Sequence, residues 1–360
     1  MSARQILEAF GRWRTDRVPL ALVTVVETEG STYTKAGHRI LIAGTGDFQG
    51  LVSGGCLEGD LAGHAREVLA SGCAQLLTYD LRDGTDEIWG LGIGCHGLFR
   101  VLLQPLLPET GYAPFAAIAD RMLGDHPAMT ATVVESGSAD LPPGATVITG
   151  ADLPVAWQIP ASGRERLIAA CRARTGQQRG ELAIDTFNGR SAKILFAPLK
   201  SLPRLLVLGA GLDAVPLVEM AHRLGWRVMV ADHRPAFLGR GDLATAEKTL
   251  QLTPADLPRA ISLAKFSAAV VMSHHLETDR AYLQMLAKSS LPYIGLLGPA
   301  ARRERLLADL GVDGAALRPR LRSPVGLQIG ANSPESIALA ILAEIHETLA
   351  GRVDIVAGAR

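Results

Sequence analysis

Several features that would assign a protein to a broad class are scarce in this chain of 360 residues. It has no run of 18 apolar residues, so we expect no membrane-spanning helix. Its 36 basic residues balance its 36 acidic residues, so no net charge attracts nucleic acid or a membrane surface. Only four cysteines occur, at irregular spacing, which favours reduced thiols in the cytoplasm over a disulfide framework. The N-terminus predicts an amphipathic helix and not a secretion signal.

Aromatic residues contribute only 5% of the chain, whereas apolar residues contribute 48%. This composition is typical of an α/β protein rich in Ala, Leu and Gly. The length allows two or three domains. We predict an N-terminal domain over 1–200 with a mixed sheet, a linker near 200–203, and a second domain over 201–360. Residues 106–200 predict a few short strands and one helix, and we interpret them as an extension of the first domain without an assigned function.

The segment Gly50–Asp60 contains the most informative local pattern of the first half. A short apolar strand breaks at Ser53-Gly54-Gly55, and a helix is predicted from Cys56 onward, with Glu58 on its charged side. Glycines allow a ligand to approach the backbone, and a helix N-terminus attracts anions and lowers the pKa of a thiol. A tight turn in which Cys56 is a small buried hydrophobe explains the same pattern.

A second glycine-rich segment, 89–97, carries Cys95 and leads into an apolar strand that we expect to stop at Pro105. Each glycine-rich loop thus presents one thiol beside a strand of the same predicted sheet. We favour their convergence on one site, because binding loops gather at strand ends. Two structural turns without a shared site are the alternative.

The second half predicts a Rossmann-like, doubly wound parallel sheet. An apolar strand at 204–208 is followed by a G-x-G-x-x-A turn formed by Gly209, Gly211 and Ala214, then by a helix and a second strand ending at Asp232. In this pattern Gly209 makes the turn, Gly211 admits a phosphate, and Asp232 accepts hydrogen bonds from a ribose. His274 follows a later strand at the same sheet edge, as a ligand contact or as a structural residue.

Together these motifs resemble the XdhC/CoxI family of accessory proteins for molybdenum hydroxylases. The resemblance rests on motifs near both ends of the chain: Gly30-Ser31, 50–59, 92–95, the G-x-G-x-x-A turn, 230–235, 293–298, 324–330 and 333–337. It implies a chaperone that binds molybdenum cofactor and passes it to an apo-hydroxylase such as xanthine dehydrogenase. Family members often act together with a cysteine desulfurase, and we also expect a homodimer.

Under this resemblance, the candidate cofactor-binding residues of the first domain are Gly54, Gly55, Cys56, Glu58 and Cys95. Thiolates suit molybdenum, so Cys56 and Cys95 are the candidate metal ligands, while Glu58 would orient the ligand or accept a proton. Gly209, Gly211, Ala214, Asp232 and His274 would bind the nucleotide of a dinucleotide cofactor, or a separate nucleotide.

Two positions depart from the family pattern. Leu212 stands where a histidine is common, and His96 stands where a glycine is expected.

Two other functions compete with the chaperone. An NAD(P)-dependent oxidoreductase would use the Rossmann-like turn and Asp232, but the sequence supplies no convincing proton donor with a substrate-positioning arginine. A structural zinc site at Cys56 and Cys95 lacks any C-x-x-C pair. We therefore expect an accessory factor and assign no catalytic residue.

Overall fold

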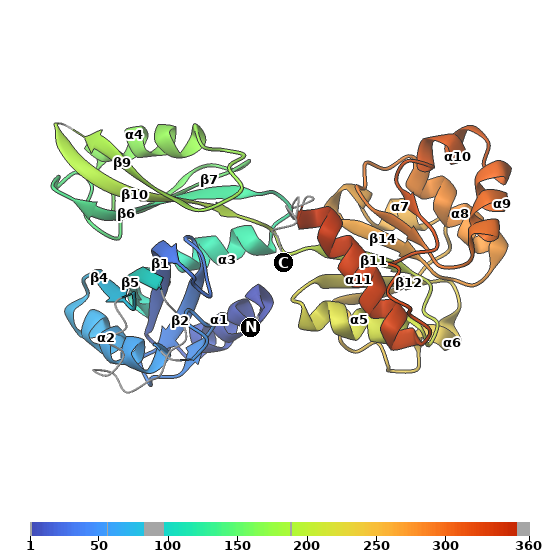
Figure 1. Cartoon of the computed structure of the whole chain (residues 1–360), viewed down its shortest axis with the longest axis horizontal. Helices are drawn as coiled ribbons and strands as arrows, with labels where there is room; N and C mark the ends of the chain where they lie inside the picture. The colour runs from blue at the N-terminus through green and yellow to red at the C-terminus, as the bar shows by residue number, and fades with distance from the viewer. Residues whose placement is uncertain (1, 56, 83–96, 188, 351–360) are drawn as a thin grey trace. The chain divides into compact units, whose positions relative to one another are not determined.

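A computed structural model describes residues 2–55, 57–82, 97–187 and 189–350 of the chain (Figure 1). The chain folds as two units, Met1–Ser201 and Leu202–Arg360. The first unit contains two antiparallel sheets and the second a six-stranded parallel sheet. The predicted α/β fold with a Rossmann-like C-terminal part is confirmed, while the N-terminal part has two antiparallel sheets in place of one mixed sheet.

The first sheet of unit 1 has the strand order β3-β2-β1-β5-β4. Its central strand is β1, whose apolar and β-branched residues 20–26 are all buried. The elements of this part are α1 (Ala3–Thr15), β1 (Leu20–Gly30), β2 (Arg39–Ala43), β3 (Phe48–Gln49), α2 (Glu58–Ser71), β4 (Gln75–Asp80) and β5 (Gly97–Leu106). The predicted hairpin of β2 and β3 is present as an antiparallel pair.

The prediction that Pro105 stops its strand is wrong. Strand β5 continues to Leu106, and Pro105 is paired with Ala21 of β1. On the other side of β5, pairing with β4 ends at Leu103. The missing N–H of Pro105 therefore lies at an open edge, where proline is tolerated.

Residues 107–199 form a sheet of their own, with the order β8-β7-β6-β10-β9. The sequence predicted parts of β6, β7, β10 and α4, but not β8, β9 or α3. The elements are η2 (Pro108–Thr110), α3 (Phe115–Leu123), β6 (Ala128–Ser136), β7 (Thr146–Thr149), β8 (Val155–Trp157), α4 (Ala161–Arg172), β9 (Glu181–Phe187) and β10 (Arg190–Leu199).

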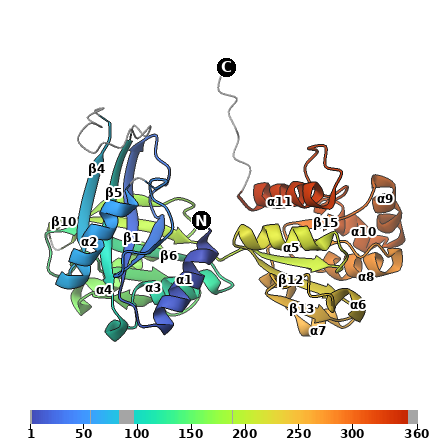
Figure 2. The ribbon, with the colours of Figure 1, turned by 90° about the horizontal axis from the view of Figure 1, so that it is seen from below.

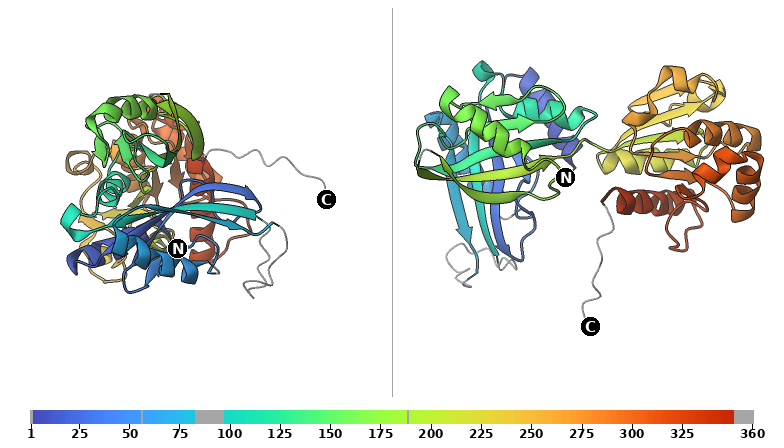
Figure 3. Two further views of the ribbon diagram at one scale, coloured as in Figure 1. Left: turned by 90° about the vertical axis from the view of Figure 1, so that its left-hand side faces the viewer. Right: turned by 90° about the horizontal axis from the view of Figure 1, so that it is seen from above.

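The two sheets of unit 1 are each covered by a helix on one face and share a small apolar cluster. Helix α2 packs on the first sheet through Leu61 and Val68. Helix α4 lies on one face of the second sheet (Figure 3), where its Leu167 and Cys171 belong to the sheet's apolar core. The shared cluster joins residues from both sheets, including Val26 and Leu195.

Unit 2 has the strand order β13-β12-β11-β14-β15-β16, in which the order reverses between β11 and β14. Such a reversal creates a crevice at the carboxyl ends of the strands. The elements are β11 (Arg204–Leu208), α5 (Ala214–Arg223), β12 (Arg227–Asp232), α6 (Pro235–Leu238), β13 (Lys248–Gln251), α7 (Leu257–Ala260), η3 (Leu263–Lys265), β14 (Ala268–Val271), α8 (Leu276–Ala287), β15 (Ile294–Leu296), α9 (Ala300–Asp309), α10 (Val312–Leu317), β16 (Leu321–Arg322) and α11 (Pro334–Ala350).

Helices cover both faces of this parallel sheet. Alternate residues of β11 point to opposite faces, so Leu205 and Val207 pack with α5 and α11, while Leu206 and Leu208 pack with α8 and α9. Figure 2 shows α5 and α11 together on one side of the sheet. None of the helices in the described part of the chain has the length and apolar character needed to cross a bilayer.

Candidate functional site

The glycine-rich turn before α2 leaves its backbone accessible. Gly54 and Gly55 are exposed and have φ angles of 85° and 120°, a conformation that favours glycine. Apart from its chain neighbours, no atom of the described residues lies within 4 Å of a Cβ built at Gly55. A ligand can therefore approach this stretch of main chain closely.

Glu58 anchors the turn from the protein interior. Its side chain is fully buried, and its Oε1 atom accepts hydrogen bonds from the backbone N–H groups of Val52 (2.7 Å) and Ser53 (3.1 Å). Its Oε2 atom accepts from Ser53 Oγ at 2.9 Å, and Ser53 Oγ in turn accepts from the N–H of Leu57 at 2.9 Å. The carboxylate therefore ties the start of α2 to the segment Val52-Ser53, which follows β3 and precedes the glycines.

The expectation that Glu58 lies on a charged, exposed side of the helix is wrong. Helix α2 begins at Glu58, and this first side chain turns back into the protein to satisfy the buried N–H groups. Burial alone would raise the pKa of Glu58, but the hydrogen bonds from Ser53 and Val52 outweigh it and hold the pKa below its ordinary value. At neutral pH the group is an ionised structural acceptor.

Loop 31–37 lies beside this turn. Thr34 Oγ1 donates to the carbonyl of Val52 at 3.0 Å, and a Cβ atom at Gly54 would lie 4.0 Å from the exposed ring of Tyr33. Gly97, the first residue of β5, pairs with Gly30, and a Cβ atom there would be only 2.7 Å from Thr32 Cγ2. The end of the second glycine-rich segment thus approaches the same loop as the first turn.

Two of the predicted site residues, Cys56 and Cys95, lie outside the described residues, as does His96. The convergence of the two thiols therefore stays a prediction. Among the described residues, no group of three or more His, Cys, Asp or Glu side chains is arranged to hold a metal ion. Of the other cysteines, Cys73 is exposed and Cys171 is buried in the core of the second sheet.

His38 is a neighbour of this region that sequence reasoning missed. Burial lowers its pKa, a hydrogen bond with Leu51 opposes that shift, and its Nε2 atom is buried without a partner among the described residues. The available signal was a histidine directly after Gly37 at the start of a strand.

The G-x-G-x-x-A turn of unit 2 has the backbone geometry that its sequence predicts. Gly209 has a φ of 122°, and a Cβ atom there would lie 2.5 Å from the carbonyl oxygen of Met272. Ala214 is fully buried against the sheet at the start of α5. The turn therefore packs tightly against the end of β14, at the crevice where the strand order reverses.

Asp232 is brought to this turn, but it binds the protein itself. Its Oδ2 atom accepts from the N–H of Ala210 (2.8 Å) and from Arg234 Nη2 (2.7 Å), while Oδ1 accepts from the Arg234 N–H and Nε at 2.9 Å. These four bonds use the acceptor positions of a carboxylate that is 1% exposed. In this conformation Asp232 has no oxygen left to bind a ribose.

A second carboxylate, Asp213, lies over the turn. Its Oδ2 atom is 2.7 Å from Nε2 of His274, whose φ of 61° is unusual for a residue other than glycine. A Cβ atom at Gly211 would lie 2.4 Å from Asp213 Oδ1, so the absence of a side chain at 211 makes room for this carboxylate. The negative charge occupies the space through which a phosphate would approach. Sequence reasoning missed Asp213 although it lies within the turn motif.

A buried polar cluster fixes the neighbouring strand end. Asp279 Oδ1 accepts from Ser273 Oγ at 2.5 Å, and its Oδ2 accepts from Arg302 Nη2 at 2.6 Å. The hydroxyl of Tyr282 is buried without a partner among the described residues, and burial together with Asp232 raises its pKa. The cluster ties β14 to α8 and α9 and thereby holds His274 in place.

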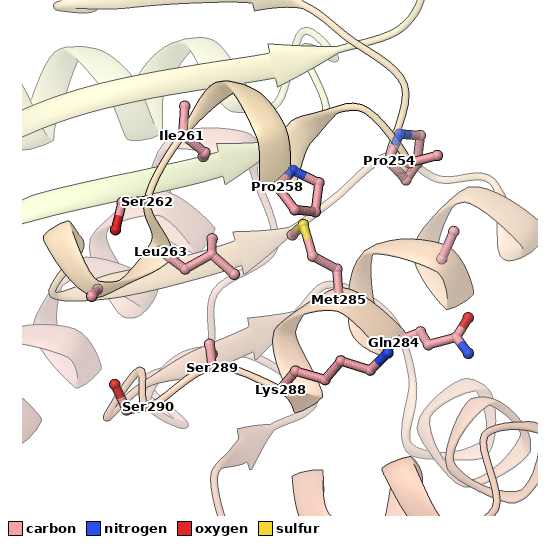
Figure 4. Close-up of a pocket in the computed structure, with 13 residues that line it drawn as sticks. Pro254, Pro258, Ile261, Ser262, Leu263, Gln284, Met285, Lys288, Ser289 and Ser290 are labelled. Carbon is pink, nitrogen blue, oxygen red and sulfur yellow. The ribbon is translucent and has the colours of Figure 1, made fainter.

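An apolar groove of this unit lies away from the turn. It has a volume of about 690 Å³ and opens between α7, η3 and the C-terminal end of α8 (Figure 4). Pro258 and Met285 face one another across it, and Lys288 lies beside Gln284 at its edge. None of the predicted site residues lines it.

Comparison with known proteins places this geometry in a family. Residues 13–80 match the model of the XdhC and CoxI family, and residues 205–345 match the model of the XdhC Rossmann domain. A Bacillus subtilis protein named as a probable subunit of xanthine dehydrogenase is 31% identical over 92% of this chain and 94% of its own length. The chain belongs to the XdhC and CoxI family.

Two further relatives extend the comparison. The Escherichia coli molybdenum cofactor insertion chaperone PaoD is 22% identical over 90% of this chain and 81% of its own length. A crystal structure of a protein described as a xanthine dehydrogenase from Bacillus halodurans superposes with a TM-score of 0.78 at 28% identity. That alignment covers 98% of this chain and 97% of the solved chain.

Proposed function

We propose that this protein binds molybdenum cofactor and delivers it to a molybdenum hydroxylase such as xanthine dehydrogenase. The observation that carries the proposal is the accessible main chain of Gly54 and Gly55, next to Val52 and Ser53, whose N–H groups Glu58 anchors. The alignment with a relative that is named as a cofactor insertion chaperone supports the same role.

The proposed cargo matches the chemistry of this turn. Cys56 and Cys95 would supply thiolates to molybdenum, and the N–H groups near Gly54 and Gly55 would bind the phosphate of the pterin. Glu58 would act indirectly, because its oxygens already accept hydrogen bonds from the turn. Glu58 would contribute by fixing the backbone of the turn.

Unit 2 is a weaker candidate for binding a nucleotide, whether as part of a dinucleotide cofactor or alone. A bound phosphate would require the Asp213 carboxylate to leave the turn, and a bound ribose would require Arg234 to release Asp232. The alternative function, an NAD(P)-dependent oxidoreductase, meets the same obstacles. At the crevice, moreover, Arg234, Arg240 and Arg302 are each paired with a protein carboxylate, which leaves none of the three to position a substrate.

The proposed role implies partners. An apo-hydroxylase would receive the cofactor, a cysteine desulfurase would supply the terminal sulfido ligand, and a second copy of the chain would complete a homodimer. We place this process in the cytoplasm.

Co-expression with the cofactor biosynthesis pathway tests the proposal. Purified protein is analysed for molybdenum by elemental analysis and for pterin by fluorescence after oxidation. We expect both in stoichiometric amount, with strong loss in Cys56→Ala and little loss in Cys73→Ala, which alters an exposed cysteine. Equal retention by both variants, or no molybdenum in the wild type, would contradict the proposal.

A separate assay addresses the oxidoreductase. Mixing the protein with NADH and small carbonyl compounds should leave nicotinamide fluorescence unchanged. Turnover of NADH would favour the alternative function.

A further inference from the structure

A cavity of about 740 Å³ lies in unit 1, where loop 31–37 meets the second sheet. Its apolar lining includes Val26, Leu182 and Pro198, and two cationic side chains, Lys35 and Arg179, also line it. Small-molecule sites have this character: a mostly apolar wall, a few polar groups, and a volume of roughly 300–1,000 Å³.

Two glycines bring the walls of the cavity together. A Cβ atom at Gly180 would lie 2.2 Å from the carbonyl oxygen of Ala36, and one at Gly37 would lie 3.0 Å from Cβ of Ala197. Gly37 also has a φ of 93°. Any side chain at 180 would force the segments apart, so the chain crosses there at backbone contact.

This crossing brings the backbones next to the two cationic residues together. Lys35 precedes Ala36, and Arg179 precedes Gly180, so each cation lies one residue from the point of contact. Both side chains belong to exposed residues that line the same cavity. Lys35 and Arg179 lie far apart in the sequence, and folding of the second sheet brings them to the same cavity.

The positive charge of this cavity is not neutralised by the described part of the protein. Lys35 Nζ donates to the neutral Thr32 Oγ1 at 3.2 Å, and Arg179 has no ion pair within the described part of the chain. The acidic lining residue, Glu27, is paired with Arg100 at 3.0 Å.

A third cationic side chain, Arg39, lies next to the lining of the cavity. Arg39 donates to the carbonyl of Gly37 (3.2 Å) and to Thr130 Oγ1 (2.8 Å), and no described carboxylate pairs with it. Burial lowers its pKa to about 10, so it remains charged at neutral pH. Its field adds to that of Lys35 and Arg179, because charges in a low-dielectric wall are weakly screened.

We propose that this cavity binds a small phosphate monoester with an apolar or planar body, the phosphate held by Lys35 and Arg179 at the rim. The body rests against Leu182 and Pro198, the partly exposed apolar residues of the lining. Two cations match the charge of a phosphate dianion, and an arginine can hold its oxygens through two parallel hydrogen bonds. No covalent step is involved.

The site is separate from the proposed cofactor site but connected to it. Loop 31–37 lines the cavity through Lys35, Ala36 and Gly37, and contacts the glycine-rich turn through Thr34. Occupancy of the cavity would therefore restrain the loop that also adjoins Gly54.

Isothermal titration calorimetry of the full chain with phenyl phosphate tests the proposal without any molybdenum cofactor, so its outcome is independent of the proposed function. We expect saturable binding that is weakened roughly tenfold by Lys35→Gln and by Arg179→Gln, the loss expected for one charged hydrogen bond. Arg172→Gln, which alters an exposed arginine on α4, should leave the affinity unchanged.

Two further probes test the phosphate group and the apolar body of the ligand separately. Inorganic phosphate, which lacks the body, and benzyl alcohol, which lacks the charge, should both bind more weakly than phenyl phosphate. The proposal is overturned if phenyl phosphate shows no saturable binding at millimolar concentration, or if Arg172→Gln weakens it as much as Arg179→Gln. Equal affinity for phenyl phosphate and either simpler probe would also overturn it.

Discussion

Neutralising Glu58 is the sharpest test of how the glycine-rich turn is held. The carboxylate accepts three hydrogen bonds, two from backbone N–H groups and one from Ser53 Oγ. Hydrogen bonds to charged groups contribute about 1.5–3 kcal/mol and neutral ones about 0.5–1.5 kcal/mol, so Glu58→Gln weakens each by about 1 kcal/mol. The neutral amide is easier to bury, which offsets part of this loss, and we expect a net loss of about 1–2 kcal/mol.

Hydrogen–deuterium exchange, measured by mass spectrometry on peptides that cover 50–57, detects this loss locally. A loss of about 1.4 kcal/mol corresponds to tenfold faster exchange once intrinsic rates are corrected. Glu67→Gln is the matched control, because Glu67 lies on the same helix with its side chain 66% exposed. Wild-type exchange in Glu58→Gln would refute the assignment of Glu58 as the support of the turn.

The pH dependence of the same exchange has a defined sign. The pKa of Glu58 is lowered in the folded protein, so its ionised form stabilises the turn above the ordinary Glu pKa of about 4.3. This contribution is lost as the pH falls below that value toward the folded pKa. The difference between wild type and Glu58→Gln should therefore shrink on acidification, and a constant difference would contradict the mechanism.

Three further substitutions test the backbone and the second unit. Gly63→Ala, inside α2 with no described atom outside the adjacent helix backbone within 4 Å of the new methyl group, should stabilise unit 1 by about 0.5–1 kcal/mol in thermal unfolding. Gly209→Ala combines a positive φ with a clash against a main-chain carbonyl, and should destabilise unit 2 by at least about 3 kcal/mol. Arg234→Ala leaves the buried Asp232 without its cation and should cost about 3–5 kcal/mol. Urea unfolding measures both changes in unit 2 when it is followed by tryptophan fluorescence in a background where Trp13, Trp89 and Trp157 are replaced by Phe, so that the buried Trp226 alone reports. Unchanged midpoints would contradict them.

The sequence predicted the second unit better than the first. Its strands β11, β12, β14 and β15 are mainly apolar runs, its turn motif directly precedes a helix, and the parallel order follows from alternating strands and helices. The short edge strands β13 and β16 carry polar residues and were not predicted. The second sheet of unit 1 was predicted only in part. Strand β9 carries exposed Ile184 and several polar residues, so hydrophobic pattern alone does not reveal it.

The site residues show a similar limit. Local pattern located Gly54, Gly55, Gly209 and Ala214, because a positive φ angle favours glycine and close packing favours a small side chain. It could not show that Glu58 and Asp232 turn inward, since the N–H groups they satisfy become buried only in the folded chain. The pairing of Asp213 with His274 joins residues 61 positions apart and has no local signal.

Because Glu58 anchors the glycine-rich turn from the protein interior, the anchoring has a consequence for the exchange of the proposed ligand. Both carboxylate oxygens of Glu58 bond to groups inside the protein. A ligand on the outer surface of the turn can therefore leave without breaking a hydrogen bond that holds the turn. Binding and release of the proposed cofactor would then carry no folding penalty at this turn, and the empty protein would already hold the shape that binds it.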